Sequence, residues 1–147
     1  MNAKTVCSVM LFSYNALEKR CKAIDKAIYS TALHSARKNT LEVCMEIERL
    51  TNEKIAYINT KIAVEKALAT LNRTYEIEHH HFKGESIEQI ASTLNEKWVT
   101  IERRLSRQRA RLYEVMQRYN SAEELFDIIS GSEWLMSRYK RELRQKL

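Results

Sequence analysis

The chain has almost no residues that break helices, and this limits the folds open to it. Its 147 residues include no proline and two glycines, Gly84 and Gly131. A β-rich protein needs proline and glycine at the many tight turns between its strands. The length suits one compact domain, or a small domain with an extended arm, and allows one modest core. We therefore predict an all-α fold.

The N-terminal segment has a heptad repeat. The repeat places small and apolar residues at two positions, namely Cys7, Tyr14, Cys21 and Ile28 at one, and Met10, Leu17, Ile24 and Thr31 three residues after each. This spacing makes a narrow seam along one face of a helix, and such a seam needs a partner helix. Within it, cysteines act most simply as small apolar side chains that fill space.

A second helix follows a short polar stretch. The apolar spacing lapses over residues 35–40, where Asn39 or Thr40 can cap a new helix. The next apolar stripe drifts around the helix, which favours packing against more than one neighbour. An antiparallel hairpin of the two helices is the simplest arrangement, and a coiled-coil dimer is the alternative. We expect residues 1–72 to form a helical arm that dimerises the protein or binds a partner.

Capping signals divide the rest of the chain into shorter helices. A helix from Tyr75 through Phe82 should end at Gly84, which can adopt the left-handed conformation. Ser86 and Gln89 form a capping box that opens a helix over residues 87–94. Asn95 suits a tight turn, and a longer helix should follow from residue 98 to residue 119. We assign residues 73–119 to one domain.

Residues 120–147 are predicted to form a helical tail. Ser121 and Glu124 make a second capping-box-like start, and another helix should begin at Ser132 or Glu133 after Gly131. The tail mixes apolar and basic residues, so the sequence assigns it no specific role.

The spacing over residues 77–112 is typical of a helix-turn-helix. Two helices that cross steeply through a short turn need a small residue at the crossing, and Ala91 provides it. The inner faces are apolar in both helices: Ile87, Ile90 and Leu94 in the first, and Ile101, Leu105 and Leu112 in the second. The outer face of the second helix is left to residues such as Val99, Arg103 and Arg107. Arginine there can contact guanine edges or phosphates.

Positive charge is concentrated in the same helix. The whole chain has a net charge of +6. Residues 97–118 carry seven basic side chains against two acidic ones, a local excess of five. A basic surface of this kind suits a polyanion such as DNA. We expect Arg104 and Arg111 to form intramolecular pairs instead.

This part of the chain resembles region four, the C-terminal DNA-binding region, of primary-type bacterial sigma factors. About 45 residues align without a gap, and they include Leu68, Leu71, Phe82-Lys83-Gly84, Ser86, Glu88-Gln89-Ile90-Ala91, Leu94, Thr100-Ile101, Arg104-Leu105-Ser106-Arg107 and Leu112. The layout also resembles small phage- and prophage-encoded regulators that place a helical arm before a sigma-like module. At the turn the chain differs from the family, with Glu96 at a usually apolar position and Lys97 where serine commonly caps the second helix.

The resemblance implies a sequence-specific transcriptional regulator. Its recognition helix, at about residues 98–112, would lie in the major groove of double-stranded DNA. The expected DNA-binding residues are Ser86, Lys97, Trp98, Val99, Thr100, Arg103 and Arg107. The expected partners are DNA, RNA polymerase and a second copy bound through the N-terminal helices, in the bacterial cytosol at the nucleoid. Two alternatives stay open: a phage DNA-packaging subunit like the small terminase, and a module that binds only RNA polymerase.

Other functions find little support in the sequence. The three cysteines are an odd number without metal-binding spacing, and no stretch approaches the roughly 20 apolar residues that span a membrane. His79, His80 and His81 are consecutive, so on a helix they point about 100° apart and cannot converge on one ion. No phosphate loop or activated nucleophile is evident. We therefore expect no enzymatic activity, no metal, no cofactor and no membrane association.

Overall fold

The computed structural model describes residues 2–34 and 39–146, and all regular structure within these ranges is helical. The all-α prediction is confirmed. In chain order the elements are α1 (Ala3–Leu33), α2 (Thr40–Leu68), α3 (Tyr75–Ile77), the π-helical segment η2 (Glu78–Phe82), α4 (Ile87–Leu94), α5 (Trp98–Tyr119), α6 (Ala122–Ser130) and α7 (Glu133–Gln145). Part of the polar stretch between the first two helices, residues 35–38, lies outside the described residues.

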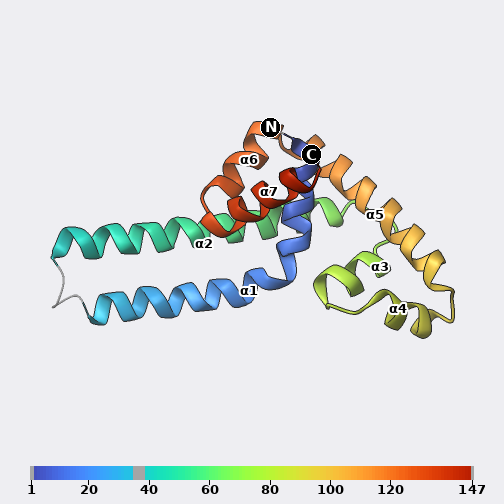
Figure 1. The fold of residues 1–147 in the computed structure, drawn as a ribbon, viewed down its shortest axis with the longest axis horizontal. Coiled ribbons are helices and arrows are strands. Elements are labelled where there is room, and N and C mark those ends of the chain that lie inside the picture. The colour runs from blue at the N-terminus through green and yellow to red at the C-terminus, as the bar shows by residue number, and fades with distance from the viewer. Residues whose placement is uncertain (1, 35–38, 147) are drawn as a thin grey trace.

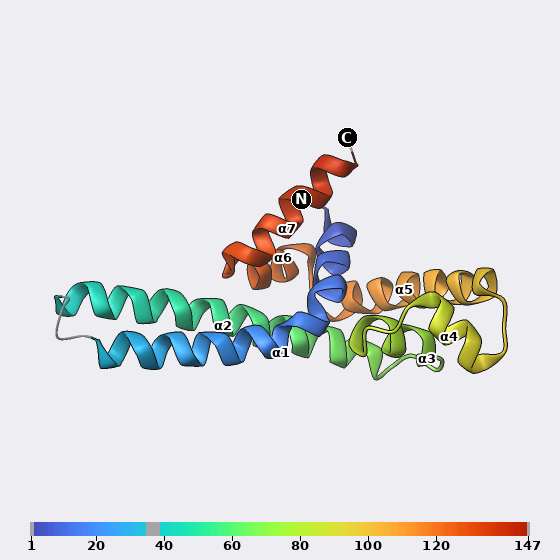
Figure 2. The same cartoon turned by 60° about the horizontal axis from the view of Figure 1, so that its bottom comes forward.

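Helices α1 and α2 lie antiparallel and form a long arm (Figures 1 and 2). The heptad seam of α1 faces inward, with Leu17 and Ile24 buried. Polar contacts also join the two helices: the Tyr14 hydroxyl donates to Glu65, and Lys54 pairs with Asp25 at 2.6 Å. The structure therefore has the hairpin arrangement, with the seam filled from within the chain.

The helices begin at the capping residues that the sequence indicates. Asn39 accepts the Glu42 backbone N–H at 2.8 Å and caps α2. The capping boxes at Ser86 and Ser121 are both formed, and they open α4 and α6. Each cap satisfies backbone donors that a helix start leaves free.

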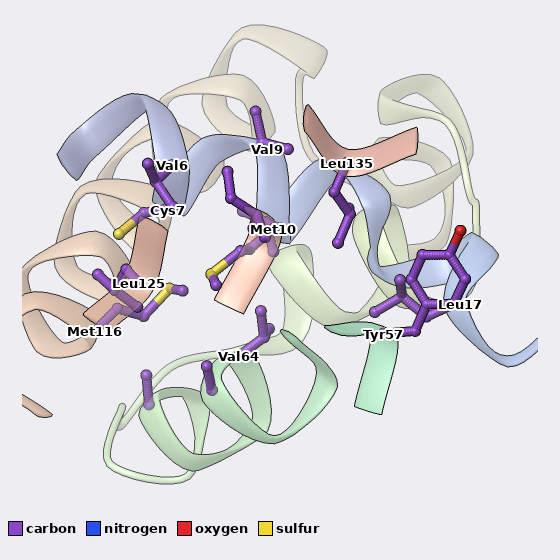
Figure 3. Close-up of a cluster of buried hydrophobic side chains, with 14 of the residues drawn as sticks. Val6, Cys7, Val9, Met10, Leu17, Tyr57, Val64, Met116, Leu125 and Leu135 are labelled. Carbon is purple, nitrogen blue, oxygen red and sulfur yellow. The ribbon is translucent and has the colours of Figure 1, made fainter. Parts of the chain in front are cut away.

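The main core lies at the base of the arm. The first part of α1 meets α2, α5, α6 and α7 there, and Figure 3 shows apolar side chains from these helices pointing toward one another. Cys7 is fully buried among them, and burial raises the pKa of its thiol to about 12. It therefore acts as a small apolar side chain, as the heptad position predicts. The core draws residues from the arm, from α5 and from the C-terminal tail alike.

The tail packs on α2 through a buried carboxylate. Glu53 accepts the Tyr57 hydroxyl at 2.7 Å, the Ser132 hydroxyl at 2.8 Å and the Glu133 backbone N–H at 3.2 Å. Gly131 lies against Ala56 of α2. The N- and C-terminal ends consequently lie side by side (Figure 1), and the Asn2 backbone N–H donates to the Tyr139 hydroxyl at 3.3 Å. This packing leaves α3, α4 and α5 projecting away from the arm.

Candidate nucleic-acid interface

Helices α4 and α5 are joined by the three residues Asn95, Glu96 and Lys97. Asn95 has a φ of 53°, the left-handed conformation that asparagine tolerates better than most residues. The Glu96 backbone N–H donates to the Ala91 carbonyl at 2.9 Å and closes the end of α4. The bounds of both helices, and the role of Asn95, agree with the sequence prediction.

Apolar residues hold α4 against α5. Ile90, Ala91 and Ile101 form a small buried cluster, with Ile87 and Leu94 packed against it. Further along α5, Leu105 and Leu112 are fully buried in the main core. The small cluster fixes α4 on α5, and the main core fixes α5 on the rest of the molecule.

Glu96 and Arg104 pair across the turn. Arg104 donates to Glu96 at 2.9 Å and also reaches the buried Glu76 at 3.5 Å. The hydrogen bond to Glu96 raises the pKa of the Arg104 guanidinium. The acidic turn residue Glu96 thus has a structural partner. The expected intramolecular pairing of Arg104 is confirmed.

Arg109 is half-buried and points toward the interior. It donates through Nε to Nε2 of His81 at 2.8 Å, and its guanidinium lies 4.9 Å from the ring centroid of Phe12 on α1. His81 is buried, and burial together with the charge of Arg109 lowers its pKa to about 3. A neutral His81 can accept this hydrogen bond. Arg109 therefore joins η2 and α1 to α5 and is not available to a ligand.

The other two histidines brace the loop before α4. His79 contacts the Glu85 carboxylate at 2.9 Å, and His80 donates to the Glu85 backbone carbonyl at 2.8 Å. His79 and His80 thus both contact Glu85, whereas His81 accepts from Arg109. In residues 2–34 and 39–146, no cluster of histidine, cysteine or acidic residues is placed to hold a metal ion.

The predicted DNA-binding residues of α5 lie mostly at the surface. Trp98 and Val99 are 54% and 44% exposed, Arg103 and Arg107 are exposed, and Thr100 is half-buried. Arg103 and Arg107 are one helical turn apart, so they share a face of the helix. Val99, Thr100, Arg103 and Arg107 lie on one side of α5 and form a surface that begins at its first turn, whereas Trp98 points to another side of the helix.

Ser86 and Lys97 stand at the starts of the two helices, and both are exposed. The Ser86 hydroxyl accepts the Gln89 backbone N–H at 3.1 Å, so it serves the capping box. Among the described residues, Lys97 occupies the capping position of α5 without a side-chain hydrogen bond.

Two further arginines belong to this surface, and sequence reasoning missed both. Arg111 was expected to pair within the chain, but the described residues provide it with no ion pair or hydrogen bond. Arg73 precedes α3 and lines the same hollow as Arg107 and Arg111. Its position in a polar loop gave no sequence signal, because only the fold brings residue 73 beside α5.

A comparison with protein-family models, curated proteins and solved structures finds no match to this chain. In the part of the chain that the structure describes, no helix is long and apolar enough to cross a membrane.

Proposed function

We propose that this protein is a sequence-specific DNA-binding transcriptional regulator of the phage or prophage type. The exposed face of α5 would enter the major groove, and α4 would lie across the DNA backbone. The sequence resemblance to sigma region four supports this proposal. Acting on DNA, the protein would work in the bacterial cytosol at the nucleoid.

The observation that best supports the proposal is that some arginines of α5 are paired within the chain and others are not. Arg104 and Arg109 are paired within the chain, with Glu96 and His81 respectively. Arg103 and Arg107 face outward, and no partner for either is found among the described residues. A helix stabilised only by surface charge would be expected to pair its outer arginines with nearby carboxylates. Unpaired arginines on one face beside an exposed Val99 suit contacts to base edges and phosphates.

A duplex-binding assay tests the proposal. The full chain is used to select sequences from a random pool of duplexes, and its affinity for the selected duplex is then compared with that for a scrambled one. Replacing Arg103 and Arg107 by alanine should abolish the preference. The matched control replaces Lys19 and Lys26, which are exposed on the arm. It removes the same charge and should keep the preference. Unchanged binding by the Arg103→Ala, Arg107→Ala variant would contradict the proposal.

We also propose that a second copy binds along the arm. The α1 seam is filled internally, but the face of α2 opposite its buried side carries an exposed apolar stripe. Its members are Leu41, Met45, Ile55, Ile58 and Ile62. The stripe suits another helix of similar pattern, and α2 of a second copy provides one.

Charge favours an antiparallel pair of α2 helices. In a parallel pair in register, each residue meets its own copy, so Glu48 would face Glu48 within the stripe. Lys61 of one copy would also lie beside Lys66 of the other, because residues five positions apart pair along the flanks of a parallel coiled coil. An antiparallel pair avoids both like-charge contacts. It places the Leu41 and Met45 end of one stripe against the Ile58 and Ile62 end of the other.

Mass measurement separates this proposal from the packaging alternative. A dimer fits a regulator, whereas a closed ring of many copies would favour a packaging subunit. Capture of RNA polymerase by a protein that lacks duplex affinity at low salt would favour the polymerase-binding alternative.

A further inference from the structure

A basic hollow lies between α5 and the segment that leads into α3. It has a volume of about 850 Å³ and is lined by residues 70–76 and 78 and by one flank of α5. Four arginines line it, namely Arg73, Arg104, Arg107 and Arg111, together with Glu76 and Glu78. The lining therefore carries two more positive than negative side chains.

The acidic residues of the hollow are already engaged. Glu76 is buried, contacts Arg104 at 3.5 Å and accepts the Gln108 side-chain amide at 2.7 Å. Glu78 accepts the Thr74 hydroxyl at 3.1 Å. Both carboxylates are thus held by groups of the hollow itself.

Three of the arginines are left without a partner. Arg73, Arg107 and Arg111 are exposed, and the described residues offer none of them a hydrogen bond or ion pair. Arg107 and Arg111 are one turn apart on α5, so they share a flank of that helix. Arg73 approaches from a different element. Three unpaired guanidinium groups around one hollow are suited to an anion with several oxygens, since each can donate two parallel hydrogen bonds.

We propose that this hollow binds a phosphate group, and that the phosphate belongs to the DNA strand bordering the major groove occupied by α5. The assignment to DNA rests on the proposed function. It is favoured because Arg103, Arg107 and Arg111 form a continuous row along α5, so the hollow adjoins the face proposed to contact bases. Exposed arginines also suit a polyanion, where many solvated contacts add through the release of counterions. Arg73 and Arg111 are therefore positioning residues: they bind the DNA backbone and fix the register of α5 on the duplex without contributing sequence preference.

Salt dependence tests this site. The affinity of the full chain for its selected duplex is measured over a series of potassium chloride concentrations, for the wild type and for the Arg73→Ala, Arg111→Ala variant. Loss of one phosphate contact should reduce the slope of log affinity against log salt by about 0.9. The preference for the selected over the scrambled duplex should stay unchanged. The Arg73→Lys, Arg111→Lys variant keeps the charge and should keep most of the slope.

The control again replaces Lys19 and Lys26 by alanine, which removes the same charge from the arm and should leave the slope unchanged. A slope for the Arg73→Ala, Arg111→Ala variant equal to that of the wild type would overturn the site while leaving the proposed function intact. Failure of the wild type to bind any duplex would instead count against the proposed function.

A second experiment distinguishes DNA from a free phosphate compound as the ligand of the hollow. The side-chain Nε–H resonances of the arginines are followed by NMR during titration with inorganic phosphate and, separately, with duplex. We expect the Arg73 and Arg111 signals to shift with duplex, and phosphate to compete only weakly. Saturable binding of phosphate that duplex does not displace would overturn the assignment to DNA. No response of either arginine to phosphate or duplex would overturn the site altogether.

Discussion

Gln108 shows how a polar residue can belong on the buried side of a helix. Its side-chain oxygen accepts the Ile77 backbone N–H at 2.9 Å, and its amide nitrogen donates to Glu76 at 2.7 Å. Both contacts reach residues more than thirty positions away. Gln108 thereby satisfies two buried groups and places α3 on α5.

We predict that Gln108→Leu lowers the free energy of unfolding. Leucine would fill the space but leave the Ile77 N–H and the Glu76 carboxylate short of a partner. The expected loss is about 1–3 kcal/mol, the cost of an unsatisfied buried polar group. Urea denaturation measures it, with exposed Gln117 replaced by leucine as the control. Equal stability of the Gln108→Leu variant and the control would show that these hydrogen bonds contribute little.

His81 should make stability depend on pH. Its pKa is lowered from about 6.5 to about 3 by burial, by Arg109 and by His80. Below pH 6.5 the unfolded chain therefore binds a proton that the folded chain does not, so stability falls as pH falls toward 3. The contribution approaches 1.4 kcal/mol per pH unit.

The variant His81→Gln isolates this effect. Glutamine can still accept the Arg109 hydrogen bond but does not titrate, so its free energy of unfolding should change less steeply between pH 6.5 and pH 4. Equal slopes for the variant and the wild type would mean that His81 is protonated in the folded protein.

The sequence predicted contacts between near neighbours in the chain better than contacts between residues far apart in it. The capping roles of Asn39 and Ser86 and the turn conformation of Asn95 depend on neighbours within a few residues, and all three agree with the structure. The partner of Arg109 lies 28 residues away in η2, and Arg111 was expected to have a partner that the described residues do not provide. Such pairings depend on how helices pack, which residue spacing alone does not determine.

Helix α5 begins without a side-chain cap. Lys97 has the extended backbone of a capping residue, with φ −74° and ψ 144°, but within the described chain its side chain makes no capping hydrogen bond. The first backbone N–H groups of α5 therefore remain available to solvent or to a ligand.

We predict that Lys97→Ser stabilises the protein and weakens its binding to DNA. A serine cap should add about 1 kcal/mol to the free energy of unfolding. In the proposed docking, loss of the ammonium group removes a phosphate contact and weakens binding. Lys97→Ala removes the same charge without supplying a cap. The proposed capping effect would be wrong if Lys97→Ser were no more stable than Lys97→Ala in urea denaturation.

The arm presents two different faces of α2. One face of α2 packs on α1 and the tail, whereas the other carries the exposed apolar stripe. The sequence showed a drifting stripe on α2 and suggested several neighbours. The structure provides α1, α5 and α6 as those neighbours. It leaves part of the stripe uncovered, and this could not be read from the pattern, because burial depends on where the tail packs.

We predict that the exposed stripe forms an antiparallel dimer. Replacing Ile58 and Ile62 by glutamate should give a monomer in sedimentation velocity experiments, whereas Tyr29→Glu, at an exposed apolar position on α1, should stay dimeric. Cys44 reports the orientation. In an antiparallel pair centred near residue 51, the two Cys44 residues are about 20 Å apart along the axis, from a rise of 1.5 Å per residue. Mild oxidation should then form no Cys44 disulfide. Its rapid formation would indicate a parallel pair.

Methylation interference on the selected duplex tests whether the exposed face of α5 contacts base edges in the major groove. Dimethyl sulfate modifies guanine at N7, in the major groove, and adenine at N3, in the minor groove. We predict that guanine methylation within the site blocks binding of the wild type, and that Arg103→Ala removes the interference at one position. Interference only at adenine N3, or none at any base of the site, would show that α5 does not contact bases in the major groove.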